Sequence, residues 1–237
     1  MDDSSMRGRG RAAQSSVAAL EAKNAAGAGG RTEGSERWRR VGARVLPVFT
    51  GERLQGTVEE GTEVVRSCLR SSDSLDGVWA EIHAILRVGM ASLVRIVYRQ
   101  VGVAPRYDGP RVKMPAAAAL VAECARPDGV ADALASVWEL VAAHVLPYVE
   151  GVFLPLVQFG VASYSGPNSV RGAVLLHFRD ALVVPLLPAL DDAARTRPPC
   201  LPALLHMLSV LAALTPADRA GPVYTAARAL AAVHQVA

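Results

Sequence analysis

The chain has 237 residues, of which 51% are hydrophobic and 20% are charged, and its formal net charge is +3. This composition excludes a wholly disordered protein, and the length suits one domain or two small ones. The weak positive charge does not indicate a nucleic-acid partner, because nucleic-acid-binding proteins gather lysine and arginine on one face.

Residues 1–34 consist mainly of glycine, alanine, serine and arginine and lack an apolar period, which predicts a disordered tail. Acidic residues stand near the N-terminus, where a signal peptide carries bases, and no apolar stretch follows them. Cys68, Cys124 and Cys200 lack the paired spacing of a zinc site or a disulfide framework, which fits a reducing compartment. We therefore expect a cytoplasmic protein with one folded domain over residues 35–237.

The first expected helix begins near Ser35 and has one apolar and one basic side. Pro47 lies inside the pattern and should kink or end the helix. The apolar side contains Trp38, Val41, Val45, Leu46 and Phe49, and the basic side contains Arg37, Arg39, Arg40 and Arg44. Basic amphipathic helices also bind anionic membranes. A peripheral membrane-binding helical adaptor is therefore an alternative function.

The next two helices have recognisable starts. Thr57 and Glu60 form a capping-box pattern, in which Thr57 caps the first turn and Glu60 reaches back. Ser71 to Ser74 opens a helix that runs to about Val101. Its apolar positions repeat at helical spacing: Leu75, Val78, Trp79, Ile82, Leu86, Met90, Leu93, Ile96 and Val97. A loop is expected over residues 102–114 and a short alanine-rich helix over about 115–125.

A long helix is expected after Asp128, which is a candidate N-cap. Its apolar positions extend from Val130 to Leu156. Pro147 and Pro155 interrupt this pattern, and each proline removes a backbone donor and bends a helix. We expect a kinked helix that curves around the core, followed by a polar loop from residue 160 to 168.

A helix over residues 169–184 is predicted next, capped by Ser169 and ended by Pro185 and Pro188. One face contains Val170, Val174, Phe178, Ala181 and Leu182, and nearly the opposite face contains Leu176 and Val183. A helix that is apolar on two sides must be covered on two sides, by its own domain or by another chain. Arg179 has no acidic residue three or four positions away, so we expect its partner to come from elsewhere.

The last segments are also helical. Residues 202–214 carry no charge, but about 13 residues span only roughly 20 Å, which is short of a bilayer core of about 30 Å. A buried core helix is the better interpretation. A final helix is expected over about 216–235. Because no segment alternates with period two, we predict an all-α fold, a single irregular bundle of about seven or eight helices.

No motif for nucleotide binding, nucleophilic catalysis or zinc catalysis occurs in the chain. The five histidines stand singly in apolar segments. His144, His177 and His206 could converge as metal ligands inside a bundle, but local hydrogen bonding is the favoured interpretation. We expect no enzyme activity, no cofactor and no metal, with an unrecognised enzyme as the least favoured alternative.

Three sequence blocks resemble the HbrB-like family, which includes the animal Protor (proline-rich protein five) proteins and their fungal counterparts. The first block runs from Arg44 to Phe49 and continues with Glu60 to Leu69. The second is Leu134–Trp138 with His144–Tyr148 and Gly151–Pro155. The third is Ser169–Arg171 with Leu175–Asp180 and Pro185.

The resemblance implies a non-catalytic subunit of target-of-rapamycin (TOR) complex two. Such a subunit associates with a Rictor-like scaffold subunit and the TOR kinase, and is linked to AGC-family kinases, growth polarity and actin. The complex could also bring the protein to the periphery of the plasma membrane. The candidate partner-binding residues lie on the two helices before and after residue 160: Trp138, Pro147, Phe153, Pro155, Arg171, Phe178, Arg179 and Asp180. The alternative is that both helices are only the domain core.

Overall fold

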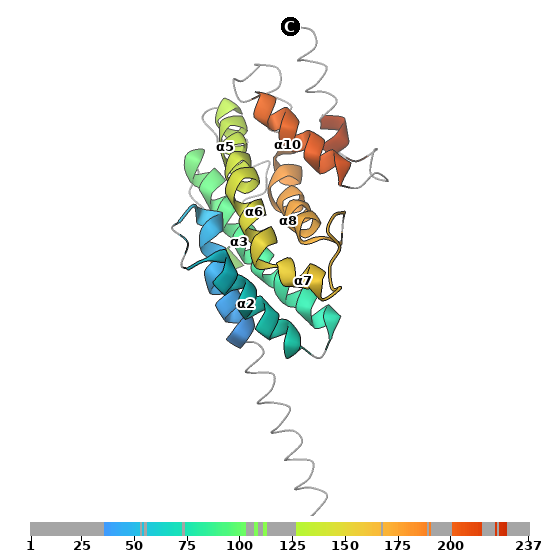
Figure 1. Cartoon of the computed structure of the whole chain (residues 1–237). Coiled ribbons are helices and arrows are strands. Elements are labelled where there is room, and N and C mark those ends of the chain that lie inside the picture. The colour runs from blue at the N-terminus through green and yellow to red at the C-terminus, as the bar shows by residue number, and fades with distance from the viewer. Residues whose placement is uncertain are drawn as a thin grey trace, which may run out of the picture.

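The computed structural model describes residues 36–52, 54, 56–72, 74–102, 107–108, 111–112, 127–166, 168–188, 190, 201–214, 221 and 223–226. These residues form a bundle of packed helices, which confirms the all-α prediction (Figure 1). The tail over 1–34, the alanine-rich segment over 115–125, Cys124 and Cys200 lie outside the described residues. Most of the predicted final helix also lies outside them.

The first described helix, residues 36–45, continues directly into the 3-10 helix η1 (Leu46–Thr50). Pro47 stands in the first turn of η1, so the proline ends the α-helix as predicted. Trp38 and Phe49 are buried in the core. The apolar side of this basic helix therefore packs inside the bundle and is not free to enter a membrane.

Helix α2 (Val58–Arg70) begins at the predicted cap, because the Thr57 hydroxyl accepts the N–H of Glu60 at 3.3 Å. The Glu60 carboxylate has a different main partner from the one expected, since Arg44 donates to it at 2.8 Å. This hydrogen bond and the charge of Arg44 lower the pKa of Glu60, and the Thr57 backbone contributes less. The capping box thus also joins α2 to the preceding helix.

Two glycines allow α2 to pack closely against α6 (Leu146–Val152). A Cβ at Gly61 would lie 3.0 Å from the Val152 side chain, and a Cβ at Gly151 would lie 2.9 Å from Val58. The Thr62 hydroxyl donates across the same contact to the Gly151 carbonyl, at 3.2 Å. Side chains larger than hydrogen at either glycine would force the helices apart.

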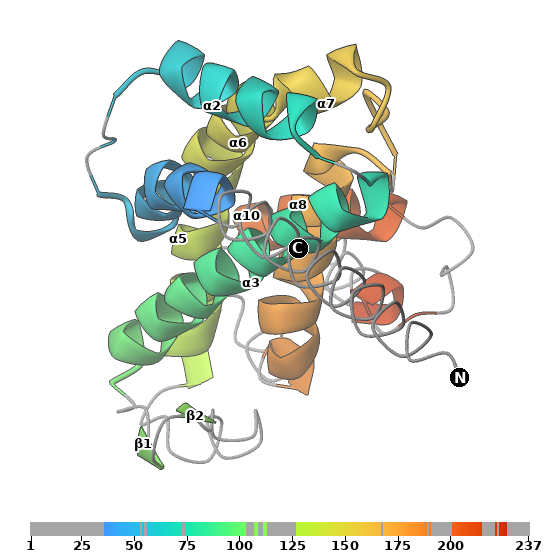
Figure 2. The same cartoon turned by 90° about the horizontal axis from the view of Figure 1, so that it is seen from below.

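Helix α3 (Leu75–Gln100) is the long central helix and packs against η1, α5 and α8. Ser74 caps it by accepting the N–H of Gly77 at 3.0 Å. The predicted apolar positions are buried with three exceptions: Leu75 is 59% exposed, and Trp79 and Ile96 are half-buried. Two short strands, β1 (Tyr107–Asp108) and β2 (Arg111–Val112), pair antiparallel beyond its C-terminal end (Figure 2).

The long helix after α3 is interrupted close to both prolines, and the predicted kinks stay a prediction. Helix α5 (Pro127–Leu140) joins α6 through the π turn η2 (Val141–Val145) ahead of Pro147. Phe153 then separates α6 from α7 (Leu154–Gln158), in which Pro155 lies in the first turn. The expected cap at Asp128 is wrong, because α5 starts at Pro127, whose fixed φ suits a first helical position.

Helix α8 (Val170–Phe178) and the π turn η3 (Arg179–Val183) form the helix predicted over 169–184. Its predicted end at Val184 is wrong, because residues 184–188 are still helical. The Val184 N–H donates to the Arg179 carbonyl, five residues back. This wider turn relieves the clash that the Pro185 ring would make with the carbonyl four residues before it.

Helix α10 (Leu201–Ala213) has the predicted length of 13 residues and packs against α5 in the upper part of Figure 1. The stretch from Gly129 to Val152 is long and apolar enough to cross a membrane by length and composition alone. More than half of its most apolar window is buried inside the protein, as in the core helix of a helical bundle.

We predict that Gly89→Ala destabilises the protein and that Gly42→Ala does not. A Cβ at Gly89 would lie 2.8 Å from the buried Phe49 ring. Overpacking of about 1–3 kcal/mol should outweigh the helix preference of alanine over glycine, about 1 kcal/mol. We expect a net loss of up to about 2 kcal/mol in urea-induced unfolding.

Gly42 is the matched control, since it is also a helical glycine near η1. Its Cβ would lie 3.6 Å from Ile85, which is an ordinary contact. Gly42→Ala should leave stability unchanged or raise it by up to about 1 kcal/mol. Equal effects of the two substitutions would contradict the Phe49 contact as the cause.

Candidate functional site

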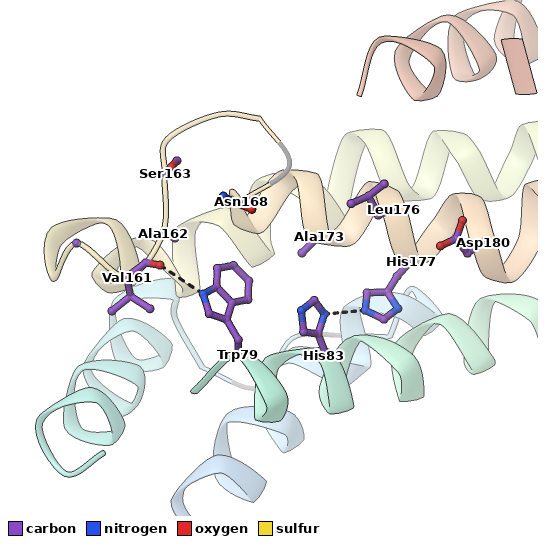
Figure 3. A pocket seen from close by; sticks show the side chains of 11 residues that line it. Trp79, His83, Val161, Ala162, Ser163, Asn168, Ala173, Leu176, His177 and Asp180 are labelled. Atoms are coloured by element: carbon purple, nitrogen blue, oxygen red, sulfur yellow. Dashed lines mark hydrogen bonds between the residues drawn. The ribbon is translucent and has the colours of Figure 1, made fainter. Parts of the chain in front are cut away.

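A cleft of about 780 Å³ opens between the N-terminal half of α3, the loop after α7, and α8 with η3 (Figure 3). Helix α3 contributes Trp79 and His83 to its lining, and the opposite wall contains Leu176, His177 and Asp180. The loop over residues 160–168 closes one end. This cleft combines aromatic rings, two histidines and a carboxylate in one concave surface, so it is the candidate functional site.

A helix-ending turn fixes the first part of the loop. Gly160 has a φ of +70°, and its N–H donates to the Val157 carbonyl at 3.0 Å. The Val161 N–H donates to the Leu156 carbonyl at 2.8 Å, which completes a Schellman motif at the end of α7. The motif places the Val161 carbonyl beside α3, where it accepts the indole N–H of Trp79 at 3.3 Å.

The cap of α8 fixes the other end of the loop. The Ser169 hydroxyl accepts the N–H of Gly172 at 2.9 Å and donates to the carbonyl of Gly166 at 2.6 Å. Ser169 itself is buried. The predicted cap is therefore confirmed, and it holds the loop against the start of α8 as well as beginning the helix.

A chain of ring contacts crosses the floor of the cleft from α3 to α8. Trp79 stacks on His83, with ring centroids 5.6 Å apart and an interplanar angle of 30°. His83 Nδ1 then lies 2.9 Å from His177 Nε2 (Figure 3). One of these nitrogens carries the hydrogen and the other accepts it. The bond therefore requires that one of the two facing nitrogens carries no hydrogen.

The surroundings of the histidine pair disfavour protonation of His177. Burial lowers the pKa of His177 first, and nearby His83 and Arg87 lower it further, whereas Asp180 raises it. His83 and Arg87 belong to α3, and Asp180 follows His177 by three residues in η3. The charge on the floor of this cleft thus depends on both helices and on pH.

The other side of α8 packs into the core through Phe178. The Phe178 ring lies 5.7 Å from that of Trp138 on α5, and the Trp138 indole donates to His206 Nδ1 on α10 at 3.2 Å. His206 therefore lies with Trp138, while His177 lies with His83. The convergence of His144, His177 and His206 as metal ligands is wrong, and His144 is exposed.

Four of the eight candidate partner-binding residues are buried: Trp138, Phe153, Pro155 and Phe178. Pro147, Arg171 and Asp180 are exposed, and Arg179 is half-buried. Both predicted helices therefore contribute mainly to the domain core. A role in partner binding stays a prediction for all eight, and the exposed positions are the ones that a partner could reach without unfolding the domain.

The charged candidates do not form one surface. Arg171 NH1 donates to Glu150 on α6 at 3.2 Å. Asp180 lines the cleft on the side of α3, and its carboxylate accepts from Arg179 Nε at 2.8 Å. Asp180, the very next residue, is therefore one partner of Arg179, and the expectation of a more distant partner stays a prediction.

Neither a metal-binding cluster nor a reactive cysteine occurs among the described residues. These residues contain no group of three or more histidine, cysteine, aspartate or glutamate residues able to hold a metal ion. Cys68 is a buried free thiol, and burial raises its pKa to about 11, so it is protonated and unreactive at neutral pH. Its interpretation as a small buried hydrophobic residue is confirmed.

Sequence reasoning missed the cleft and its histidine pair. His83 and His177 are 94 residues apart, and a helical period places each residue on a face without saying which faces meet. One signal was present: Trp79, His83 and Arg87 follow each other at intervals of four residues. A row that combines an aromatic, a titratable and a charged side chain is typical of the boundary between the buried and exposed faces of a helix.

Comparison with known proteins gives one match. The sequence model of the HbrB-like family matches residues 33–165, which is more than half of the chain. The match includes the first two sequence blocks described above. It ends at residue 165, before the third block begins at Ser169. No curated protein and no solved structure matches the chain.

We predict that the protein loses stability as pH falls through the range in which His177 is protonated. The folded-state pKa of His177 lies below its ordinary value of 6.5, so the unfolded chain binds this proton first. The stabilising contribution is complete above pH 6.5 and declines as pH falls toward the folded-state pKa. Thermal unfolding between pH 7.5 and 5 measures this slope.

His177→Gln should flatten the slope, because the variant has no titrating group at this position. His144→Gln is the control, since His144 is exposed and lies outside the cleft. An unchanged slope in His177→Gln, or an equal change in both variants, would show that the histidine pair does not cause the pH dependence.

Proposed function

The chain belongs to the HbrB-like family, and on this basis we propose that it is a non-catalytic accessory subunit of TOR complex two. In this role it binds the Rictor-like scaffold subunit and modulates TOR signalling to AGC-family kinases, growth polarity and actin. The single observation that carries the proposal is the family match over residues 33–165.

The arrangement of the described residues supports a binding role. The family is one of accessory proteins without catalytic activity, and the fold is a helical bundle. Helix α8 buries Phe178 of one predicted apolar face and Val183 of the other within its own chain. The domain therefore completes its core without a partner, so we propose that it folds first and then docks through surface residues.

The membrane-binding alternative receives no support from the first helix. Trp38 and Phe49 would have to enter the bilayer for a basic amphipathic helix to bind there. Both side chains lie in the core of the bundle. We therefore place contact with the plasma membrane at the level of the assembled complex, and we propose a cytoplasmic subunit.

Affinity purification tests the proposed function directly. A tagged full-length chain, expressed in its own cells and purified under mild conditions, should recover a TOR kinase and a Rictor-like scaffold in reproducible proportion. Mass spectrometry identifies both proteins. Recovery of neither protein, from cells in which the kinase and the scaffold are both detected, would refute the proposal.

The exposed carboxylate of the cleft provides a residue-level test. The Asp180 side chain is 62% exposed, so Asp180→Asn should fold normally. If Asp180 meets a basic group of the scaffold, the substitution should weaken binding about 1.5- to fivefold, the range for one exposed ion pair. Binding is measured as scaffold recovered per tagged chain at increasing salt.

Asp132→Asn is the matched control, because Asp132 is an exposed acid on α5, away from the cleft. This control should recover as much scaffold as the wild-type chain. Equal recovery by Asp180→Asn and the wild-type chain would remove Asp180 from the contact surface and leave the family assignment intact.

A further inference from the structure

One row of side chains runs along the whole of α3 and changes character halfway. Residues four apart lie next to each other on a helix, so the row is continuous. Its members, from the N-terminal end, are Leu75, Trp79, His83, Arg87, Ala91, Arg95 and Arg99. The first half borders the cleft, and the second half is exposed and basic.

The basic half of this row lacks acidic partners. No salt bridge joins Arg87, Arg95 or Arg99 to an acid among the described residues. The acids of α3 itself are Asp76 and Glu81, both near its N-terminal end. By contrast, Arg44, Arg66 and Arg171 each pair with a glutamate.

Helix stability alone does not account for this row. Arg99 lies in the last turn of α3, where a cation favours the helix dipole. Arg95 precedes it by four residues, and like charges at this spacing disfavour a helix. Arg95 and Arg99 are adjacent on the helix and have no acidic partner among the described residues. They are therefore suited to bind a partner that supplies negative charge.

Apolar groups lie between and beside the arginines. Val88 is 53% exposed next to Arg87, and Ala91 is exposed between Arg87 and Arg95. A protein helix can use both the charges and these apolar contacts. A phosphate backbone would use only the charges, so the composition favours a protein partner.

We propose that this face of α3 is the docking surface for an acidic amphipathic helix of a partner protein. Its carboxylates meet Arg87, Arg95 and Arg99, and its apolar side chains pack on Val88 and Ala91. The row from Arg87 to Arg99 rises about 18 Å at about 1.5 Å per residue, so about three turns of the partner helix suffice. The proposal rests on the proposed function for the partner's identity, the Rictor-like scaffold.

The test uses the full-length tagged chain purified from its own cells. Arg95→Glu combined with Arg99→Glu should reduce scaffold recovery at least about tenfold, because two attractions become two repulsions. Arg39→Glu combined with Arg40→Glu is the control with the same charge change, on the exposed side of the helix over 36–45. It should recover scaffold like the wild-type chain.

The outcomes separate this surface from the proposed function. A wild-type chain that recovers no scaffold overturns the function and this partner together. Equal recovery by the wild-type chain and the Arg95/Arg99 variant overturns only the docking surface. An equal loss in the Arg39/Arg40 control also overturns it, because the effect would then follow net charge. Unchanged circular dichroism and unfolding midpoints show that the variants fold.

A photo-crosslinking amino acid at Ala91 identifies the occupant. The captured scaffold peptide should carry at least two acidic residues at helical spacing, and changing them to lysine should restore binding to the Arg95/Arg99 variant. A captured peptide without acids overturns the proposal. Flotation with phosphatidylserine vesicles that depends on Arg95 and Arg99 would also overturn it, by assigning the surface to membrane.

Discussion

The structure depends on how α8 is held between two sets of rings. His177 and Phe178 are neighbours in sequence, but they point to different sides of the helix and contact different elements. His177 reaches His83 and, through it, Trp79 on α3, whereas Phe178 reaches Trp138 and His206 on α5 and α10. One turn of α8 thus joins the outer cleft to the inner core. A displacement of α8 would break a polar contact on one side and open a void on the other.

Two π turns let the prolines remain inside continuous helices. Each turn, η2 and η3, ends two residues before a proline, Pro147 or Pro185. The residue just before each proline, Leu146 or Val184, donates its N–H to the carbonyl five positions back. In an α-helix the proline ring would clash with the carbonyl four positions before it, and the wider turn avoids this clash. Each proline therefore lies within a helix without ending it.

Local features could be predicted from sequence, and features that depend on two distant segments could not. Thr57 and Ser169 cap their helices as expected, and Ser74 caps α3 within the predicted start, because a cap is completed within three residues. The end at Pro185 was mispredicted, because the rule for proline assumes an α-helix before it. The histidine pair was missed, since periodicity describes each helix alone. Four apolar residues that were expected at a partner surface lie in the core. Periodicity predicts that an apolar helix face is buried, but it does not say whether the same chain or a partner buries it.

The two halves of α3 explain why a self-sufficient domain can still have a docking surface. A row of residues four apart winds slowly around a straight helix, so a long helix cannot keep one row against the same neighbours throughout. In α3 the row borders α8 near Trp79 and His83 and faces solvent near Arg95 and Arg99. The core fixes the helix through its other faces, which leaves the composition of this row free of folding requirements. Arginines that have no acidic partner among the described residues can therefore serve the docking of a partner at that position.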